Sequence, residues 1–195
     1  GKKQFVWTLH DMNPLTGGCH YDRGCGRFRD QCHTCPMLDD ASVKDASYKI
    51  FSDRQSALAR LADEELHVCT PSHWLLHQLA HSKLLSRFPR SVVPYGVDTS
   101  TFSPLEKSVA RQALGIADKQ PTILFSADSL SNRRKGFDLL FTSLSLIDAT
   151  FRPLQLITVG RGSTLEIKST DLKCLNVGLV SSEHFLRILY SAADV

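Results

Sequence analysis

Short apolar runs alternate along the chain with longer segments whose apolar side chains recur at helical spacing. Runs typical of buried strands occupy residues 5–9, 66–70, 91–93, 121–125, 154–159 and 175–180. Helical spacing is found over residues 52–62, 72–82, 103–115, 136–148 and 182–192. Strands separated by helices of this length indicate βαβ units and parallel sheets, so the pattern predicts an α/β fold.

A stretch rich in turn-forming residues divides the pattern into two halves. Gly96 and Pro104, with a further proline nearby, follow the third predicted strand, as in a turn or an interdomain linker. Ser103, Pro104 and Glu106 carry the features of a helix start: a capping serine, a proline at the first helical position and a capping box. Gly115 is the expected end of that helix.

The strands on each side of this linker predict two incomplete, doubly wound sheets. We expect residues 1–95 to form the C-terminal part of one Rossmann-like domain, residues 96–105 the linker, and residues 106–195 the N-terminal part of a second. The first strand begins close to Gly1, and the last apolar pattern is interrupted at Val195. Both ends are therefore expected to be internal positions of a longer protein.

The composition is that of an ordinary globular protein. Of the 195 residues, 42% are hydrophobic and 22% are charged, and the formal net charge of +3 is too small to imply a nucleic-acid partner. No apolar run reaches the length of a transmembrane helix. Two of the six cysteines, Cys69 and Cys174, stand alone in apolar strand patterns. Dispersed buried thiols are typical of a reducing compartment, so a cytoplasmic location is expected.

Three consecutive cations precede one of the predicted helices. Arg133, Arg134 and Lys135 end a polar loop, predicted over residues 126–135, that joins an apolar strand to the helix starting at Gly136. Ligands of open α/β sheets bind outside the carboxyl ends of strands, and a helix N-terminus offers free N–H groups and a positive dipole end. The segment is therefore a candidate diphosphate site. The alternative is a solvated basic loop, the usual state of a charge run.

A histidine follows the first apolar run. His10 stands directly after the predicted strand at residues 5–9, and the active sites of parallel sheets form at the carboxyl ends of strands. His10 is therefore a candidate catalytic residue. The alternative is a structural histidine that is hydrogen-bonded locally at the end of its strand.

Four of the cysteines fall within a long loop predicted over residues 11–45. Cys19, Cys25, Cys32 and Cys35 are spaced C-x5-C-x6-C-x2-C. Thiolates are zinc ligands, and four of them can close a tetrahedral structural site. Because residues 12–40 contain few apolar side chains, ordering them needs another source of free energy, and a structural zinc supplies about 10 kcal/mol or more in small metal-folded peptides. The alternatives are two disulfides or a thiol-rich loop packed without metal.

Several short motifs occur in a distinctive order along the chain. They are Thr8-Leu9-His10-Asp11-Met12, Thr16-Gly17-Gly18-Cys19-His20-Tyr21, Thr70-Pro71-Ser72 before Trp74, Pro94-Tyr95-Gly96-Val97-Asp98, Arg134-Lys135-Gly136-Phe137-Asp138 and Leu189-Tyr190-Ser191-Ala192-Ala193-Asp194-Val195. Each motif is modest alone, but the ordered set covers nearly the whole chain. Taken together, it resembles a bacterial branch of glycosyltransferase family 4.

The resemblance implies a GT-B fold, in which one Rossmann-like domain binds a nucleotide-sugar donor and the other an acceptor. It implies hexosyl transfer with retention of anomeric configuration and without a catalytic metal. Lys135 matches the family's phosphate-binding lysine, with Arg134 and Arg133 beside it. Cations there would stabilise the diphosphate leaving group. His10 matches the family's active-site histidine, near the transferred sugar.

The chain departs from the family pattern in several places. Ala127 and Asp128 stand where the family often has Gly-Arg, so one phosphate-binding cation is missing, and Arg133 or Arg134 is the expected substitute. Tyr95 replaces the more usual asparagine. The family's acidic donor-binding pair and its glycine-rich loop fall outside residues 1–195, so this chain alone is expected to lack turnover.

The expected partners are a nucleotide-sugar donor and a glycan or lipid-linked acceptor, in glycan or polysaccharide biosynthesis. Peripheral contact with the inner membrane surface is a further expectation. Nucleic acid is not an expected partner. Two rival interpretations stay open: a zinc-stabilised binding module, and a catalytically inactive glycosyltransferase relative used in complex assembly.

Overall fold

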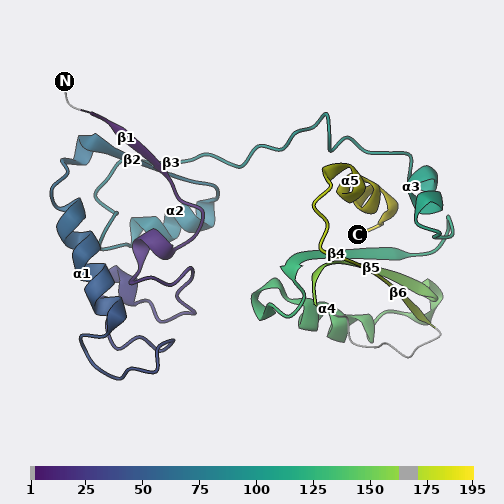
Figure 1. The fold of residues 1–195 in the computed structure, drawn as a ribbon, viewed down its shortest axis with the longest axis horizontal. Coiled ribbons are helices and arrows are strands. Elements are labelled where there is room, and N and C mark those ends of the chain that lie inside the picture. Colours follow the sequence, from purple (N-terminus) through teal and green to yellow (C-terminus); the bar gives the residue numbers. More distant parts are fainter. Residues whose placement is uncertain (1–2, 163–170) are drawn as a thin grey trace. The chain divides into compact units, whose positions relative to one another are not determined.

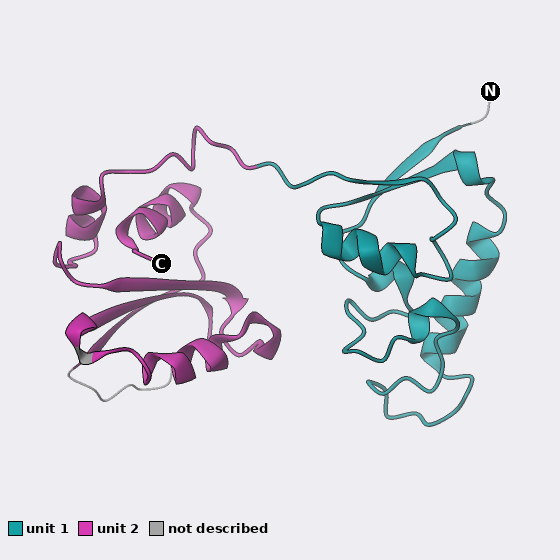
Figure 2. Ribbon diagram, turned by 180° about the vertical axis from the view of Figure 1, so that it is seen from behind, with its two compact units in different colours: residues 1–96 teal, residues 97–195 magenta. Residues whose placement is uncertain are grey.

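The computed structural model describes residues 3–162 and 171–195 of the chain. The chain forms two compact units, residues 1–96 and 97–195, each with its own three-stranded parallel sheet (Figure 2). Helices alternate with these strands, so the predicted α/β fold with two parallel sheets is confirmed. Within the described ranges, no helix has the length and apolar character needed to cross a bilayer. The acceptor-side and donor-binding roles predicted for residues 1–95 and 106–195 stay predictions, as does the linker at 96–105.

In unit 1, the three strands lie side by side in the order β1-β2-β3. The strands are β1 (Phe5–Thr8), β2 (Leu66–Thr70) and β3 (Arg90–Val92), and the helices are α1 (Ala46–Leu58) and α2 (His73–Ala80), with short 3₁₀ turns at Asn13–Leu15, Arg27–Arg29 and Asp63–Glu65. Both helices and the long loop after β1 lie on the same side of the sheet (Figures 1 and 2). Val68 of β2, Leu79 of α2 and Phe51 of α1 belong to one buried cluster on that side.

The strand β1 is exposed. Phe5, Val6 and Trp7 are 52%, 72% and 40% exposed, and within the described part of the sheet β2 is the neighbour to which β1 is hydrogen-bonded. The prediction of a buried strand at residues 5–9 is therefore wrong about burial. Only Leu9, just past the strand, is buried, at 1% exposed.

The first helix of unit 1 starts earlier than predicted. The helical spacing indicated residues 52–62, whereas α1 spans Ala46–Leu58. Its start is fixed by Asp45, whose carboxylate accepts hydrogen bonds from the backbone N–H of Tyr48 (2.9 Å) and from the hydroxyl of Ser47 (2.7 Å). An aspartate in this capping position satisfies N–H groups that the first helical turn leaves without partners.

In unit 2, helices cover both faces of the sheet β4-β5-β6, which is parallel throughout. The strands are β4 (Thr122–Ser129), β5 (Leu154–Arg161) and β6 (Leu172–Gly178), and the helices are α3 (Lys107–Ala113), α4 (Phe137–Leu144) and α5 (Glu183–Ala192), with 3₁₀ turns at Arg133–Lys135 and Ala149–Phe151. The helix α4 lies on one face, and α3 and α5 lie on the other (Figure 1). Successive residues of β5 serve the two faces, because Leu156 packs with Phe137 of α4 whereas Ile157 packs with Leu189 of α5.

Several predicted boundaries in unit 2 are wrong. The helix predicted from Ser103 begins only at Lys107, and no side chain caps it, because the chain before it makes long-range contacts such as that of Leu105 N–H to the hydroxyl of Ser191 (3.0 Å). Its predicted end is confirmed, since Gly115 has a φ of +66° just past the helix. The helix α4 covers only part of the predicted 136–148, and β6 starts before the predicted 175–180.

The strand β4 is longer than predicted. It continues to Ser129, through residues that the polar pattern assigned to the loop 126–135, because β5 pairs with it as far as Arg161 across an irregularity. Gly160 permits this pairing. A Cβ at Gly160 would stand 2.3 Å from the carbonyl oxygen of Ala127, closer than real contacts allow.

A carboxylate near the end of the chain connects three elements of unit 2. Asp194 accepts hydrogen bonds from Lys107 Nζ (2.8 Å), from Arg111 Nη2 (2.7 Å) and from the backbone N–H of Thr122 (2.9 Å). Arg111 also donates to the carbonyl oxygen of Ala192. Burial alone would raise the pKa of Asp194, but these donors and the charge of Arg111 together lower it.

Candidate functional site

The predicted catalytic histidine lies at the carboxyl end of a strand, paired with a tyrosine. His10 is exposed and follows β1 directly after the buried Leu9. Its Nδ1 atom lies 2.7 Å from the hydroxyl oxygen of Tyr95, and the two rings stack with centroids 5.7 Å apart and planes 12° from parallel. When the tyrosine hydroxyl donates to Nδ1, the neutral imidazole carries its proton on Nε2, on the opposite side of the ring.

A second hydrogen-bonded pair lies next to His10 in the sequence. Asp11 accepts a hydrogen bond from the backbone N–H of Asn13 (2.7 Å), and its other oxygen lies 2.7 Å from Nδ1 of His20. Burial alone would raise the pKa of Asp11, but the contacts with His20 and Asn13 lower it, as does the nearby His10. Asp11 is therefore an anion that holds the start of the loop against His20.

In unit 2, the three predicted phosphate-binding cations form one turn after β4. Arg133, Arg134 and Lys135 make up a 3₁₀ turn and are all exposed. Gly136 follows with a φ of +77°, a left-handed conformation that glycine adopts easily, and α4 begins at the next residue without a side-chain cap. The start of α4 thus presents its N–H groups beside a cationic turn.

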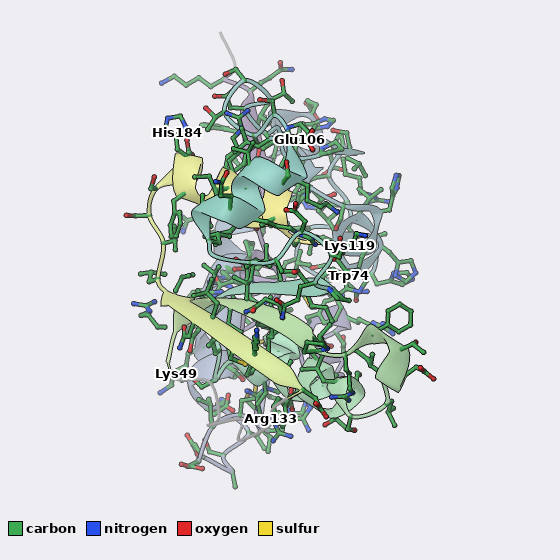
Figure 3. The ribbon with its side chains drawn as sticks, turned by 90° about the vertical axis from the view of Figure 1, so that its right-hand side faces the viewer. Lys49, Trp74, Glu106, Lys119, Arg133 and His184 are labelled. Atoms are coloured by element: carbon green, nitrogen blue, oxygen red, sulfur yellow. The ribbon has the colours of Figure 1, made fainter. Side chains whose placement is uncertain are left out.

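An open cavity of about 580 Å³ lies at the carboxyl ends of β4 and β5, against the start of α4. Its lining residues are Leu130, Ser131, Arg133, Phe137, Asp138, Phe141, Thr142 and Gly162. Arg133 is the predicted cation that lines it (labelled in Figure 3), whereas in the described part of the chain Arg134 and Lys135 belong to the same turn but not to the lining.

A second cavity, of about 540 Å³, lies at the opposite ends of the same strands. Thr122 and Leu154, which begin β4 and β5, line it together with Arg111 and Asp194. Ligands of parallel sheets bind at the carboxyl ends of strands, and Arg111, which lines this second cavity together with Lys119, is already paired with Asp194. We therefore take the cavity beside Arg133 as the candidate ligand site.

The four clustered cysteines surround one small cavity in unit 1. The cavity has a volume of about 20 Å³ and is lined by Gly17, Cys19, Cys25, Arg27, Cys32, His33, Cys35, Pro36 and Ser47. All four thiols are free, and burial raises the pKa of Cys32 to about 11. Within the described residues, no group of three or more His, Cys, Asp or Glu side chains is already arranged to hold a metal ion.

Hydrogen bonds hold the turns that carry these cysteines. The backbone N–H of Cys35 donates to the buried carboxylate of Asp45 (2.6 Å), and that of Gly17 donates to Sγ of Cys32 (3.2 Å). The carboxylate of Asp22 accepts from the N–H groups of Gly24 and Gly26, on either side of Cys25.

The loop also contains more buried apolar side chains than its composition predicted. Met12, Leu15 and Phe28 are each at most 1% exposed and join the core of unit 1. Residues 12–40 contain few apolar side chains, as expected, but these are buried in the core, so the inference that the loop needs another source of free energy to become ordered is weakened. Of the two isolated cysteines, Cys69 is buried as predicted, but Cys174 is exposed on β6.

Sequence reasoning missed the partners that hold these residues. Tyr95 lies 85 positions from His10, and Asp45 lies ten positions after Cys35, so no local spacing connected either pair. The only signal in the sequence was Tyr95 itself, which replaces the asparagine that is usual in the glycosyltransferases that the chain resembles.

Comparison with known proteins gives a fold but no family. No protein-family description matches this sequence, and no curated protein matches it. Among solved structures, the chain is similar to a sucrose-phosphate synthase from Thermosynechococcus elongatus, with 18% sequence identity and a TM-score of 0.60. The similarity covers 98% of this chain but only 43% of that enzyme, so the chain spans less than half of its length. The chain thus has a GT-B-like α/β fold, similar to that of this sucrose-phosphate synthase.

Proposed function

We propose that the protein is a glycosyltransferase that moves a sugar from a nucleotide-sugar donor to a glycan or lipid-linked acceptor. The observation that carries this proposal is the cationic turn Arg133–Lys135 beside the cavity at the carboxyl ends of β4 and β5. The fold, which is similar to that of a sugar-transferring enzyme, supports the same reaction class. Retention of configuration and transfer of a hexose are further parts of the proposal.

The cavity suits a phosphate-bearing ligand of moderate size. Its volume of about 580 Å³ falls within the usual range for small-molecule sites, about 300–1,000 Å³. Arg133 lines it, and a guanidinium presents several N–H donors in a fork that matches phosphate oxygens. The uncapped start of α4 adds backbone N–H groups and the positive end of a helix dipole.

These groups favour departure of a diphosphate. When the bond from the anomeric carbon to the diphosphate oxygen breaks, its electron pair stays on that oxygen and the leaving group gains negative charge. Fixed cations and N–H donors stabilise this charge more in the transition state than in the ground state. Arg133, with Lys135 and Arg134 on the same turn, would supply them.

Binding of nucleoside diphosphates tests this assignment directly. We expect calorimetry with UDP, GDP and ADP to show binding of at least one of them to the full-length protein. Arg133→Ala should weaken that binding by about 10- to 100-fold, because Arg133 lines the cavity and a hydrogen bond to a charged group contributes about 1.5–3 kcal/mol. Lys135→Ala, which removes a cation of the same turn outside the lining, should weaken it in the same direction.

A lysine at the other end of the same strand provides the matched control. Lys119 is exposed and precedes the start of β4, whereas Arg133 follows its end (both labelled in Figure 3). Lys119→Ala should leave diphosphate affinity unchanged. If all three variants bind as tightly as the unmodified protein, the turn does not hold the diphosphate.

We propose that His10 acts on the transferred sugar and that Tyr95 positions it. The support is the contact of 2.7 Å between His10 Nδ1 and the Tyr95 hydroxyl, which fixes the ring and leaves Nε2 free to donate. In the active enzyme, His10→Ala should lower kcat more than it weakens donor binding. Tyr95→Phe keeps the stacked ring but removes the hydroxyl.

The pH profile separates positioning from mere packing. Tyr95→Phe should lower kcat with little change in KM and shift the pH dependence of kcat, because Nδ1 loses its partner. The control is Tyr190→Phe, which changes an exposed tyrosine of α5 and should alter neither kcat nor its pH dependence. Equal kcat and an unchanged profile in Tyr95→Phe would contradict the positioning role. Donor binding without any turnover would instead favour an inactive relative.

A further inference from the structure

We propose that four cysteines of the loop between β1 and α1 bind one structural Zn²⁺: Cys19, Cys25, Cys32 and Cys35. The geometry points to this site because all four line the same cavity in unit 1. The proposal is independent of sugar transfer, since it concerns how the loop is held rather than what the protein does to a substrate.

The cavity has the size of a single ion. A volume of about 20 Å³ exceeds the 10–15 Å³ or so that one water needs, but it is far too small for an organic ligand. In a tetrahedral thiolate site the Zn–S distance is about 2.3 Å, which places the sulfurs about 3.8 Å from one another. The thiols do not yet form such a group, so binding requires side-chain rotation toward the centre of the cavity.

The backbone that carries the thiols is already fixed. Asp45 holds Cys35 at the start of α1, and Asp22 closes the turn around Cys25. Gly17 packs so tightly that a Cβ there would lie 2.3 Å from the carbonyl oxygen of Ser47. The loop is therefore already ordered before zinc binds, so binding would cost little further conformational entropy.

Charged and polar groups around the cavity suit a thiolate cluster. A zinc ion with four thiolates carries net negative charge, and the guanidinium of Arg27 lines the cavity while donating to the carbonyl oxygens of His33 and Thr34. The N–H of Gly17 donates to Sγ of Cys32 at 3.2 Å. Hydrogen bonds of this kind orient metal ligands and stabilise their charged form.

Zinc binding by the four thiols needs no oxidant, whereas formation of two disulfides does. Each thiol that binds zinc releases one proton to solvent, and nothing is oxidised. Two disulfides would require an oxidant to accept two electrons for each bond, and all four cysteines are free thiols in the structure. His33 lines the cavity as well, but four thiolates already complete a tetrahedral shell.

Metal analysis of the full-length protein, purified under reducing conditions, tests the proposal. We expect about one zinc per chain. Cys25→Ser and Cys35→Ser should each lose most of it, whereas Cys174→Ser, which changes an exposed thiol of unit 2, should keep it. His33→Ala should also keep it. Zinc absent from the unmodified protein, or lost equally from Cys174→Ser, would overturn the assignment.

A second measurement works without any variant. Under native conditions, a thiol reagent should modify few of the four loop cysteines, and addition of a zinc chelator should expose about four more thiols per chain. Co²⁺ added to the chelated protein should give the visible absorption of tetrahedral thiolate coordination. No gain in reactive thiols and no such spectrum would show that the cavity holds no metal.

Discussion

Loss of the Asp194 carboxylate should destabilise unit 2 far more than loss of the lysine beside it. Asp194→Ala removes an acceptor that is shared by Lys107, Arg111 and the N–H of Thr122. The side chain of Arg111 is only 4% exposed, so its charge would stay buried without its counter-ion. The lysine, in contrast, is 48% exposed and water replaces its partner easily.

Known magnitudes separate the two changes. Breaking a buried ion pair from one side costs about 3–5 kcal/mol. Asp194 is itself 40% exposed, and Arg111 keeps its bond to the carbonyl oxygen of Ala192, so we expect about 2–4 kcal/mol for Asp194→Ala. An exposed ion pair contributes at most about 1 kcal/mol, so Lys107→Ala should cost less than that.

Hydrogen exchange provides a readout confined to unit 2. Both tryptophans of the chain, Trp7 and Trp74, lie in unit 1, so their fluorescence reports on that unit alone. Backbone amides of β4 should exchange faster in Asp194→Ala, by the factor that corresponds to its lost stability. The urea midpoint followed by tryptophan fluorescence should not move.

An exposed aspartate of the same unit is the matched control. The carboxylate of Asp148 accepts a hydrogen bond from the N–H of Thr150 at a short 3₁₀ turn, outside β4, and Asp148→Ala should leave exchange in β4 unchanged. The reasoning fails if Lys107→Ala costs as much as Asp194→Ala, or if neither alters protection of β4.

Two further changes test how the cysteine loop is held. Gly17→Ala places a Cβ against the carbonyl of Ser47 and should destabilise unit 1 by about 1–3 kcal/mol in urea unfolding followed by tryptophan fluorescence, whereas Gly96→Ala, with nothing within 4 Å, should not. Burial alone would raise the pKa of Asp45, but the N–H of Cys35 and the hydroxyl of Ser47 help to lower it. Its contribution to stability is therefore present above its unfolded pKa, about 3.9, and is lost as pH falls through the lower folded value. In Asp45→Asn, the free energy of unfolding of unit 1 should depend less on pH in this acid range. The same pH dependence in the variant and in the unmodified protein would contradict the assignment.

The alternation of strands and helices could be predicted because each element buries its own apolar side chains. Boundaries failed where distant residues compete for local groups. Ser103 has the pattern of a helix cap, but its segment is held by Ser191, and α3 begins later. The polar residues after Phe125 do not suggest a strand, yet pairing with β5 extends β4 through them.

The candidate sites show the same limit. The position of His10 after a strand could be predicted, because parallel strands share one carboxyl edge. Its contact with Tyr95 could not, because it depends on how the chain returns 85 residues later. The three predicted cations look alike in the sequence. Only the geometry of the turn shows that Arg133 lines the cavity.

The exposed strand β1 also has a consequence for the solubility of this chain. An apolar strand with backbone donors and acceptors open along one edge is a template for pairing with other molecules, and natural proteins protect such edges with charges, especially lysine. In Phe5, Val6 and Trp7, β1 presents apolar surface, and within the described residues only one strand pairs with it. The chain taken alone should therefore aggregate as its concentration rises, through unit 1 first. Val6 is 72% exposed, so Val6→Lys should improve solubility at little cost to the fold.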